Sequence, residues 1–305
     1  MATKIEWTEK VWNPVTGCTK VSEACRNCYA EVMARRLSGM PGSKEKYKNG
    51  FNPTIHPDCL KEPYSWKKPT MCFVVSMGDL FHKQVPIEFI DRVFDVIDKT
   101  PQHTYQVLTK RAMRMAWYFS QHRQIPKNVW LGVTCEDSKY YDRICHLRGV
   151  KDATVKFISC EPLLGNMPDI DLNGIDWVIT GGESGVNARR TDPHWFRSLR
   201  DATLAAHKAF FFKQWGAWGE DGVKRSKYKN GSLLDGEEWK MMPCDDVRYN
   251  KELGCRVNLT QLQRVAKKDT KYCMYSKDSY TDEERKSLCD GCEEDCEYNQ
   301  KKKPV

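Results

Sequence analysis

The sequence predicts an α/β protein: a partial or full (β/α) barrel of about six or seven βα units, followed by a cysteine-rich C-terminal appendage. Three observations lead to this prediction. Short runs rich in Val, Ile and aromatic residues recur along the middle of the chain, as in strands buried on both faces. Helical periodicity fills the stretches between the runs, so neighbouring strands are expected to be parallel. Polar residues close each run.

The expected strands follow one another at regular intervals. They lie at residues 10–13, 71–79, 104–111, 129–137, 155–162, 176–185 and 209–216. After the second strand, Ile90, Val93 and Phe94 mark one face of a helix that begins near Pro86. A further helix is expected over residues 193–207. Each strand with its helix has a length typical of a βα unit.

Two segments depart from this repeat. Residues 38–70 are rich in Gly, Pro and Lys, and we expect them to form an excursion over the barrel. From residue 244 the composition shifts towards charge and cysteine. We therefore expect a barrel domain at residues 1–243 and a cysteine-rich region at residues 244–305.

Composition limits the class of protein. The 305 residues carry a net charge of +8 and fourteen cysteines. No apolar stretch of about 18 residues and no signal sequence is present, so we expect neither a membrane span nor secretion. In the reducing cytoplasm, cysteines are metal ligands, catalytic thiols or buried residues more often than disulfides. The positive charge suits an anionic partner such as nucleic acid.

Three cysteines, Cys18, Cys25 and Cys28, lie within eleven residues after the first expected strand. Four thiolates would close a tetrahedral metal site, and two would suggest a redox pair. Three thiolates on a [4Fe–4S] cluster leave one iron free to bind a further ligand. The alternative is a zinc site completed by another ligand such as His56 or His82.

Polar side chains follow the expected strands. They are Ser76 and Asp79; Thr109, Lys110 and Arg111; Thr134, Glu136 and Asp137; Ser159 and Glu161; Thr180, Glu183 and Ser184; and Lys213 and Gln214. The carboxyl ends of parallel strands gather at one edge, where α/β proteins bind their substrates. Strand ends also meet solvent, which alone favours polar residues. The recurrence at successive strands predicts a single polar mouth beside the three-cysteine loop.

This loop, placed at the mouth of a predicted barrel, resembles the radical S-adenosylmethionine superfamily. There, three cysteines hold a [4Fe–4S] cluster whose free iron binds S-adenosylmethionine, and cleavage yields a 5′-deoxyadenosyl radical that acts on the substrate. The spacing here is C-x6-C-x2-C where C-x3-C-x2-C is usual, and Asn27 replaces the usual aromatic residue. The resemblance implies a barrel of the radical S-adenosylmethionine type, with the cluster on Cys18, Cys25 and Cys28.

A more specific resemblance is to a family of phage and prophage proteins that looks like a branch of this superfamily. It rests on WNPVTGC (12–18), CRNCYAE (25–31), SMGDLFH (76–82), GVTCED (132–137), CEPLLG (160–165), GGESG (181–185) and FFKQWG (211–216). In some phages, proteins of this family belong to pathways that hypermodify thymine in viral DNA. The resemblance therefore implies an isomerase that converts N-linked glycyl-methyl-thymine to its C-linked form. DNA repair like that of spore photoproduct lyase is the alternative enzymatic function.

The resemblance also implies contacts to the cofactor. The expected contacts are Gly78 and Asp79 to its amino group, Thr134 and Glu136 to its ribose, and Ser184 to the cofactor or to a substrate phosphate. Lys110 and Arg111 are expected at the cofactor carboxylate or a substrate phosphate. A structural salt bridge is the alternative for the charged residues.

Two further residues are candidates for catalysis. Cys160 ends a strand, and it is either a hydrogen-atom donor at the mouth or a core residue. Lys213 lies near Trp215 and Trp218 at the last expected strand. Aromatic rings beside cations are suited to stacking on a flipped base, although tryptophans also fill the end of a barrel core.

A second cysteine cluster lies near the C-terminus. Its members are Cys273, Cys289, Cys292 and Cys296, with the spacing C-x15-C-x2-C-x3-C. Four thiolates predict a closed site, either a second [4Fe–4S] cluster or a structural zinc.

The partners follow from these interpretations. We expect DNA carrying a modified thymine, and a reductase or flavodoxin-type electron donor, in the cytoplasm of a phage-infected bacterial host. The competing hypothesis is a non-catalytic, zinc-stabilised nucleic-acid-binding protein. The exact substrate and the oligomeric state stay open.

Overall fold

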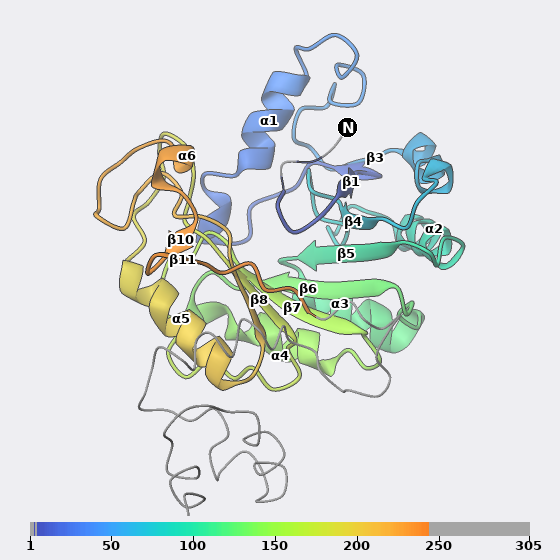
Figure 1. Cartoon of the computed structure of the whole chain (residues 1–305). Helices are drawn as coiled ribbons and strands as arrows, with labels where there is room; N and C mark the ends of the chain where they lie inside the picture. Colours follow the sequence, from blue (N-terminus) through green and yellow to red (C-terminus); the bar gives the residue numbers. More distant parts are fainter. Residues whose placement is uncertain (1–2, 4, 244–305) are drawn as a thin grey trace, which may run out of the picture.

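A parallel sheet of seven strands forms the centre of the computed structural model, which describes residue 3 and residues 5–243 (Figure 1). The strands are β1 (Lys10–Trp12), β4 (Met71–Val74), β5 (Thr104–Thr109), β6 (Val129–Thr134), β7 (Val155–Cys160), β8 (Trp177–Thr180) and β9 (Ala209–Phe212). They lie side by side in chain order, and every neighbouring pair is parallel. All seven expected strands are present. Because β1 and β9 form the edges of this sheet, the architecture is consistent with a partial (β/α) barrel.

Helices connect the strands. They are α1 (Tyr29–Leu37), α2 (Ile87–Asp98), α3 (Ala112–Trp117), α4 (Tyr141–Gly149), α5 (Pro193–Ala205) and the short α6 (Lys227–Asn230). The expected apolar face of α2 is confirmed, since Ile90, Val93 and Phe94 are fully buried. The carboxylate of Asp192 caps α5 by accepting the backbone N–H of His194 at 2.9 Å. No helix in the described part of the chain is long and apolar enough to cross a membrane.

Shorter elements lie around the sheet. Two antiparallel pairs join β2 (Val15–Thr16) to β3 (Thr54–Ile55) and β10 (Leu233–Leu234) to β11 (Glu237–Glu238). Short helical turns lie at Glu23–Cys25, Pro57–Lys61, Pro63–Ser65, Tyr118–His122 and Ser138–Tyr140. The indole Nε1 of Trp12 donates to the Cys59 carbonyl at 2.8 Å. Together with the β2–β3 pair, this bond holds the 38–70 excursion against the start of the sheet.

The strand interiors are buried on both faces, as the short apolar runs predict. Every residue of β6 is buried. Gly132 of β6 leaves room for the ring of Phe157, because a Cβ at this glycine would lie 2.5 Å from the ring atoms. Trp177 packs edge-on against Trp7 and Trp130. Aromatic side chains therefore fill much of the main core.

A close backbone contact seats the three-cysteine loop at the carboxyl edge of the sheet. Gly17 pairs with Gly78, which follows β4, and the Gly17 N–H donates to the Met77 carbonyl at 2.8 Å. A Cβ on Gly78 would lie 2.7 Å from the Gly17 carbonyl oxygen, and one on Gly17 would lie 2.2 Å from the carbonyl oxygen of Asn52. Gly17 also has a φ of +81°, which L-residues rarely adopt. Only glycine fits either position without displacing backbone.

The expected C-terminal region, residues 244–305, lies outside the described residues together with Cys273, Cys289, Cys292 and Cys296. The metal site there and the domain boundary at residue 243 stay predictions.

Two glycines with the same backbone conformation provide a test of the close packing of Gly17 against the backbone of Asn52. Gly17→Ala should lower the free energy of unfolding by about 2–4 kcal/mol, because it adds overpacking to the strain of a positive φ. Gly42 also has a φ of +81° but has no atom within 4 Å of a built Cβ, so Gly42→Ala should cost only about 1 kcal/mol. Urea denaturation measures both values. Equal losses in the two variants would contradict the close approach.

Candidate functional site

The three cysteines come from one loop between β2 and α1. Cys18 directly follows Gly17, Cys25 ends a short helical turn, and Cys28 immediately precedes α1. All three are half-buried free thiols. Cys28 packs beside a small apolar cluster that combines Ala30 and Ala34 of α1 with Tyr47 and Met77. The sheet therefore fixes one end of the loop and α1 fixes the other.

The Cys18 and Cys25 thiols lie in different electrostatic surroundings. Burial and the nearby Asp79 carboxylate raise the pKa of the Cys18 thiol to about 11, and the neighbouring Cys25 adds to this shift. Burial would also raise the pKa of Cys25. A backbone hydrogen bond from Val21 and the Lys110 ammonium instead hold that pKa below its ordinary value. Cys25 is therefore the more readily ionised thiol of the two.

The thiols are bound by hydrogen bonds within the loop and to its neighbours. Cys18 Sγ donates to the Thr19 carbonyl at 3.4 Å and accepts from Arg111 Nη1 at 3.3 Å, while Cys25 Sγ lies 3.6 Å from Ser22 Oγ. Within the described residues, no three His, Cys, Asp or Glu side chains are gathered closely enough to hold a metal ion. The donor set still fits a three-thiolate cluster chemically, because three half-buried thiols share one loop. Metal binding would replace these hydrogen bonds.

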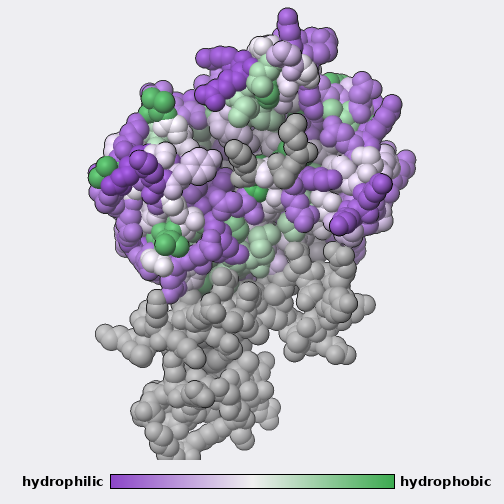
Figure 2. Space-filling model, turned by 45° about the horizontal axis from the view of Figure 1, so that its top comes forward, coloured by the Kyte–Doolittle hydropathy of each residue, from purple (hydrophilic) through white to green (hydrophobic). Residues whose placement is uncertain are grey.

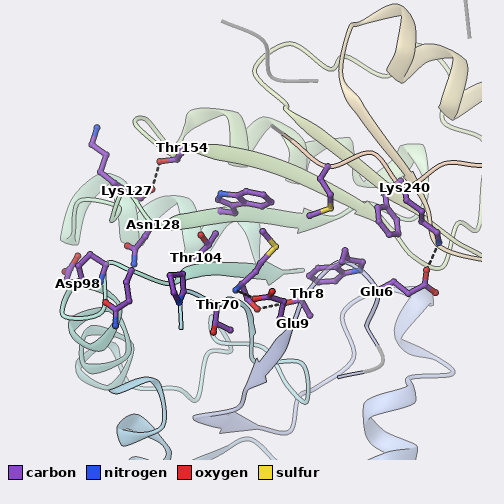
Figure 3. Close-up of a pocket in the computed structure, with 18 of the residues that line it drawn as sticks. Glu6, Thr8, Glu9, Thr70, Asp98, Thr104, Lys127, Asn128, Thr154 and Lys240 are labelled. Atoms are coloured by element: carbon purple, nitrogen blue, oxygen red, sulfur yellow. Dashed lines mark hydrogen bonds and ion pairs between the residues drawn. The ribbon is translucent and has the colours of Figure 1, made fainter. Parts of the chain in front are cut away.

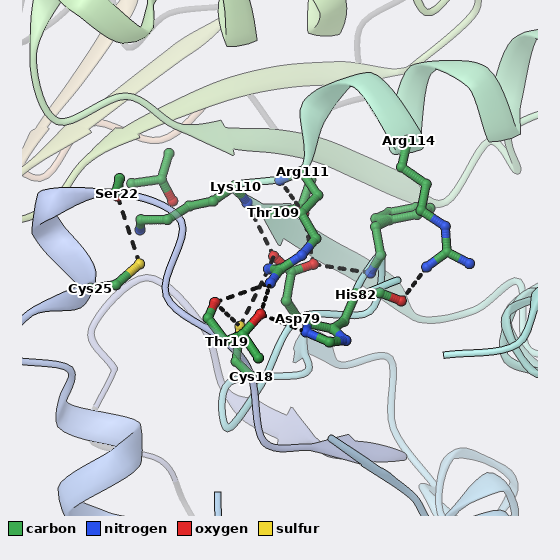
Figure 4. A network of polar contacts seen from close by, with 12 residues as sticks. Cys18, Thr19, Ser22, Cys25, Asp79, His82, Thr109, Lys110, Arg111 and Arg114 are labelled. Atoms are coloured by element: carbon green, nitrogen blue, oxygen red, sulfur yellow. Dashed lines mark hydrogen bonds and ion pairs between the residues drawn. The ribbon is translucent and has the colours of Figure 1, made fainter. Parts of the chain in front are cut away.

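An ion pair between Asp79 and Arg111 connects the turn after β4 and the end of β5 to the loop (Figure 4). Arg111 Nη1 donates to Asp79 Oδ2 at 2.8 Å, and Nη2 donates to the Thr19 carbonyl at 3.1 Å. The Thr109 hydroxyl donates to Asp79 Oδ1 at 2.7 Å. The two charged side chains are only 12% and 6% exposed. The Asp79 carboxylate was predicted to accept from the amino group of the cofactor. In the structure it is paired with the Arg111 guanidinium.

The two histidines considered as zinc ligands lie beside the loop. His82 Nε2 is 2.8 Å from the Thr19 hydroxyl, while its Nδ1 accepts the Gln84 backbone N–H at 3.1 Å. In the neutral ring, Nε2 therefore carries the proton. Burial lowers the pKa of His82. Burial also lowers the pKa of His56, to about 4, and His56 Nε2 is 2.8 Å from the Thr16 hydroxyl. Both imidazoles are engaged by threonines of the loop region.

A second ion pair binds the loop from the side of β8. Arg189 donates to Glu183 Oε2 through its backbone N at 2.7 Å and through Nε at 2.9 Å. Its Nη1 donates to the Glu23 carbonyl at 2.8 Å, and Asn27 Nδ2 donates to Glu183 Oε2 at 3.1 Å. Burial would raise the pKa of Glu183, but the hydrogen bonds from Arg189 and Asn27 hold it below its ordinary value. Arg189 and Asn27 were not among the expected site residues, although the unusual Asn27 before Cys28 was a visible signal.

The residues predicted at the cofactor ribose are buried below the mouth. Glu136 is fully buried, and its Oε2 accepts from Arg143 Nη1 at 2.9 Å. The same nitrogen donates to the Thr134 carbonyl at 2.9 Å. Glu136 Oε1 has no hydrogen-bond partner among the described residues. The structure thus brings Thr134 and Glu136 together around a structural ion pair, and their contact with a cofactor stays a prediction.

The two candidates for catalysis differ in access. Cys160 ends β7 and is fully buried in the main core, where burial raises the pKa of its thiol well above the ordinary value. Lys213 follows β9 and pairs with Glu161, with Nζ and Oε1 3.2 Å apart. Ser184 is exposed after β8, and its hydroxyl is 3.4 Å from Gln214 Oε1. Lys213 and Ser184 therefore lie at the carboxyl edge, whereas Cys160 lies beneath it.

The two tryptophans near Lys213 are held by the fold. Trp215 is 4% exposed, packs edge-on against Phe196 and Phe212, and donates through Nε1 to the Leu233 carbonyl at 2.7 Å. Trp218 Nε1 donates to the Ala188 carbonyl at 2.8 Å. These contacts favour core packing over base stacking for Trp215.

A cavity of about 890 Å³ lies at the opposite, amino edge of the sheet (Figure 3). Its walls include Thr8, Thr70, Thr104 and Thr154, which lie just before or at the first residues of strands. None of the three cysteines of the loop lines it. This cavity is therefore separate from the three-cysteine loop at the carboxyl edge of the sheet.

Removing Arg111 tests whether the buried ion pair organises this site. Arg111→Met should lower the free energy of unfolding by about 3 kcal/mol, because Asp79 is left as an unpaired buried carboxylate. Asp79→Asn combined with Arg111→Met should recover part of this loss. Arg225→Met breaks an exposed ion pair with Asp221 and should change stability little. Urea denaturation at neutral pH makes the comparison, and a loss no larger than that of Arg225→Met would contradict the buried pair.

Comparisons with known proteins give one family and one solved structure. No curated protein matches the chain. Among solved structures, spore photoproduct lyase complexed with dinucleoside spore photoproduct aligns at 11% identity and a TM-score of 0.37, over 66% of this chain and 62% of that one. The chain thus spans less than two thirds of the length of that protein. The family described as "Protein of unknown function (DUF5131)" matches residues 2–243, and the chain belongs to this family.

Proposed function

We propose that this protein is a radical S-adenosylmethionine enzyme that acts on a modified thymine in DNA. One observation carries the proposal: three half-buried thiols share a loop that is seated at the carboxyl edge of a parallel sheet. The loop is held there by two ion pairs and a glycine contact, so its position is defined by the fold. The three-cysteine motif, with its resemblance to radical S-adenosylmethionine proteins, indicates the class of chemistry.

In this proposal Cys18, Cys25 and Cys28 hold a [4Fe–4S] cluster. When bound, such a cluster offers one iron to the amino and carboxylate groups of S-adenosylmethionine and supplies the electron that cleaves the sulfonium. Coordination requires thiolates, and Arg111 at 3.3 Å from Cys18 Sγ places a positive charge beside the thiol whose pKa is raised. The Lys110 ammonium likewise places a positive charge near Cys25, whose pKa lies below its ordinary value.

The buried charges would also orient the cofactor. Asp79 already accepts hydrogen bonds from Thr109 and Arg111, so it fixes the direction of the guanidinium next to the loop. Glu136 Oε1 is an acceptor without a partner among the described residues, at the end of β6. A ribose hydroxyl is a donor suited to that oxygen, which is fully buried in this structure and would have to be uncovered for the contact to form. Gly78 keeps the backbone of the turn after β4 close to the loop.

The most specific form of the proposal is an isomerisation that moves a glycyl group on the thymine methylene from an N-linkage to a C-linkage. It rests on the motifs shared with phage and prophage proteins. A reductase or flavodoxin-type protein would deliver electrons, and the C-terminal cysteines would hold a second cluster or zinc. The cytoplasm of a phage-infected bacterium is the compartment that this reaction requires.

Single cysteine variants test the cluster. After anaerobic reconstitution with iron and sulfide, Cys18→Ala, Cys25→Ala and Cys28→Ala should each lose about four irons per chain and the matching visible absorption. Cys145→Ala, at an exposed thiol on α4, is the matched control and should keep both. Iron analysis and visible spectroscopy report the result. Colourless protein with one tightly bound zinc would instead support the non-catalytic hypothesis.

Nucleoside analysis tests the reaction. Reconstituted enzyme, reductant and S-adenosylmethionine are incubated with DNA that carries N-linked glycyl-methyl-thymine, and the DNA is then digested. The isomer should have unchanged mass but a different chromatographic retention and fragmentation. DNA containing thymine photoproducts serves as the second substrate, and its repair would favour the lyase form of the proposal. Iron-replete enzyme that changes neither substrate would contradict the assigned thymine chemistry.

A further inference from the structure

We propose that a group of exposed cations beside the three-cysteine loop binds the backbone of single-stranded DNA. This inference rests on the proposed function and names the surface that holds its polymeric substrate. The group, called here the basic rim, comprises Arg26, Arg190, Lys224, Lys227 and Lys229. All five side chains are exposed. Figure 2, with the side carrying α1 and α6 turned forward, shows a largely hydrophilic surface with scattered hydrophobic residues.

The cations of the basic rim are unpaired, unlike their neighbours. Among the described residues no carboxylate lies within ion-pair distance of any of the five, whereas Arg197 and Arg225 in the same region pair with Glu220 and Asp221. An arginine that is paired with a carboxylate adds little net positive charge to the surface. The rim therefore leaves a local excess of positive charge available to an anionic ligand.

The basic rim is continuous with the three-cysteine loop. Lys224 Nζ donates to the Val186 carbonyl, and Lys224 Nζ also lies 5.4 Å from the centre of the Trp218 ring. Asn27, next to Arg26 on the loop, donates through Nδ2 to the Asn187 carbonyl at 2.8 Å. The segment at 186–190 thus joins Lys224 to the loop, and α6, which carries Lys227 and Lys229, begins three residues after Lys224. A polymer bound on the rim would therefore run beside the candidate active site.

An exposed aromatic ring lies within the basic rim. Tyr228 is 75% exposed and stands between Lys227 and Lys229 in α6. Lys227 Nζ is 5.3 Å from the centre of this ring. A base that stacks on Tyr228 would have its flanking phosphates near the two lysines. Single strands offer unpaired bases for this contact and duplexes do not, so the arrangement favours a single-stranded stretch over a duplex.

Binding of a labelled thymidine oligonucleotide of about 20 residues to the full chain tests the surface, with fluorescence anisotropy measured across a salt series. Lys227→Gln with Lys229→Gln should reduce the slope of log K against log salt by about 1.4, or about 0.7 for each lost phosphate contact. The matched control is Lys99→Gln with Lys151→Gln, which removes the same charge from exposed lysines that precede β5 and β7. The control slope should be unchanged.

Tyr228→Ala tests the stacking contact. It should weaken binding about five-fold or more while leaving the salt slope unchanged. A rim variant with the slope of the native protein, a control that loses as much as the rim variant, or a duplex that binds as tightly as the single strand would each overturn the proposal.

The same measurements separate this inference from the proposed function. Cys18→Ala should bind the oligonucleotide with unchanged affinity and slope, because the rim contains no thiol. If nucleoside conversion succeeds while the rim variant binds normally, the surface is wrong and the enzymatic function stands. If the rim binds as expected while the protein holds no iron, the enzymatic function is wrong and the surface stands.

Discussion

The approach of Gly17 to Gly78 is the contact on which the candidate site depends. A Cβ on Gly78 would lie 2.7 Å from the Gly17 carbonyl oxygen, so the chain that follows β2 passes within van der Waals distance of the turn after β4. On its other side Gly17 packs against the backbone of Asn52, where a Cβ would lie 2.2 Å from the carbonyl oxygen. This approach brings Cys18 to within 3.3 Å of Arg111 at the end of β5. With a larger residue at either glycine, the loop would have to lie farther out, and the thiols would leave the polar edge of the sheet.

Buried charge is the second organising feature. Asp79, Arg111 and Glu136 follow the neighbouring strands β4, β5 and β6, and Arg143 of α4 pairs with Glu136. Both ion pairs are largely withdrawn from water. Such pairs rarely add stability, because desolvation offsets much of the attraction between the charges. Their position at the carboxyl edge is therefore better explained by the groups that they orient. Arg111 faces the loop, while Arg143 leaves one oxygen of Glu136 without a partner in the part of the chain that the structure describes.

The sequence allowed the sheet to be predicted well, because strands buried on both faces appear as short apolar runs and helix α2 repeats its apolar residues at helical spacing. It also placed the loop correctly at the carboxyl edge, since parallel topology determines that edge. It did not reveal which charges pair. Asp79 and Arg111 are 32 residues apart in the sequence, and only the placement of their side chains brings them together. For the same reason Trp215 could not be assigned to core or surface until its neighbours were known. Asn27 and Arg189 were missed because their contacts join the loop to the segment after β8, 156 and 166 residues away in the sequence.

The loop is anchored at two separate places on the sheet. Gly78 and Arg111 attach it near β4 and β5, and Glu183 attaches its middle beyond β8. Strands β6 and β7 lie between these anchors. The curvature of the sheet therefore sets the separation of the anchors, and with it the spacing of Cys18 and Cys25. A change of packing deep between β6 and β7, where Gly132 meets Phe157, is therefore expected to alter the spacing of the thiols without touching any residue of the loop.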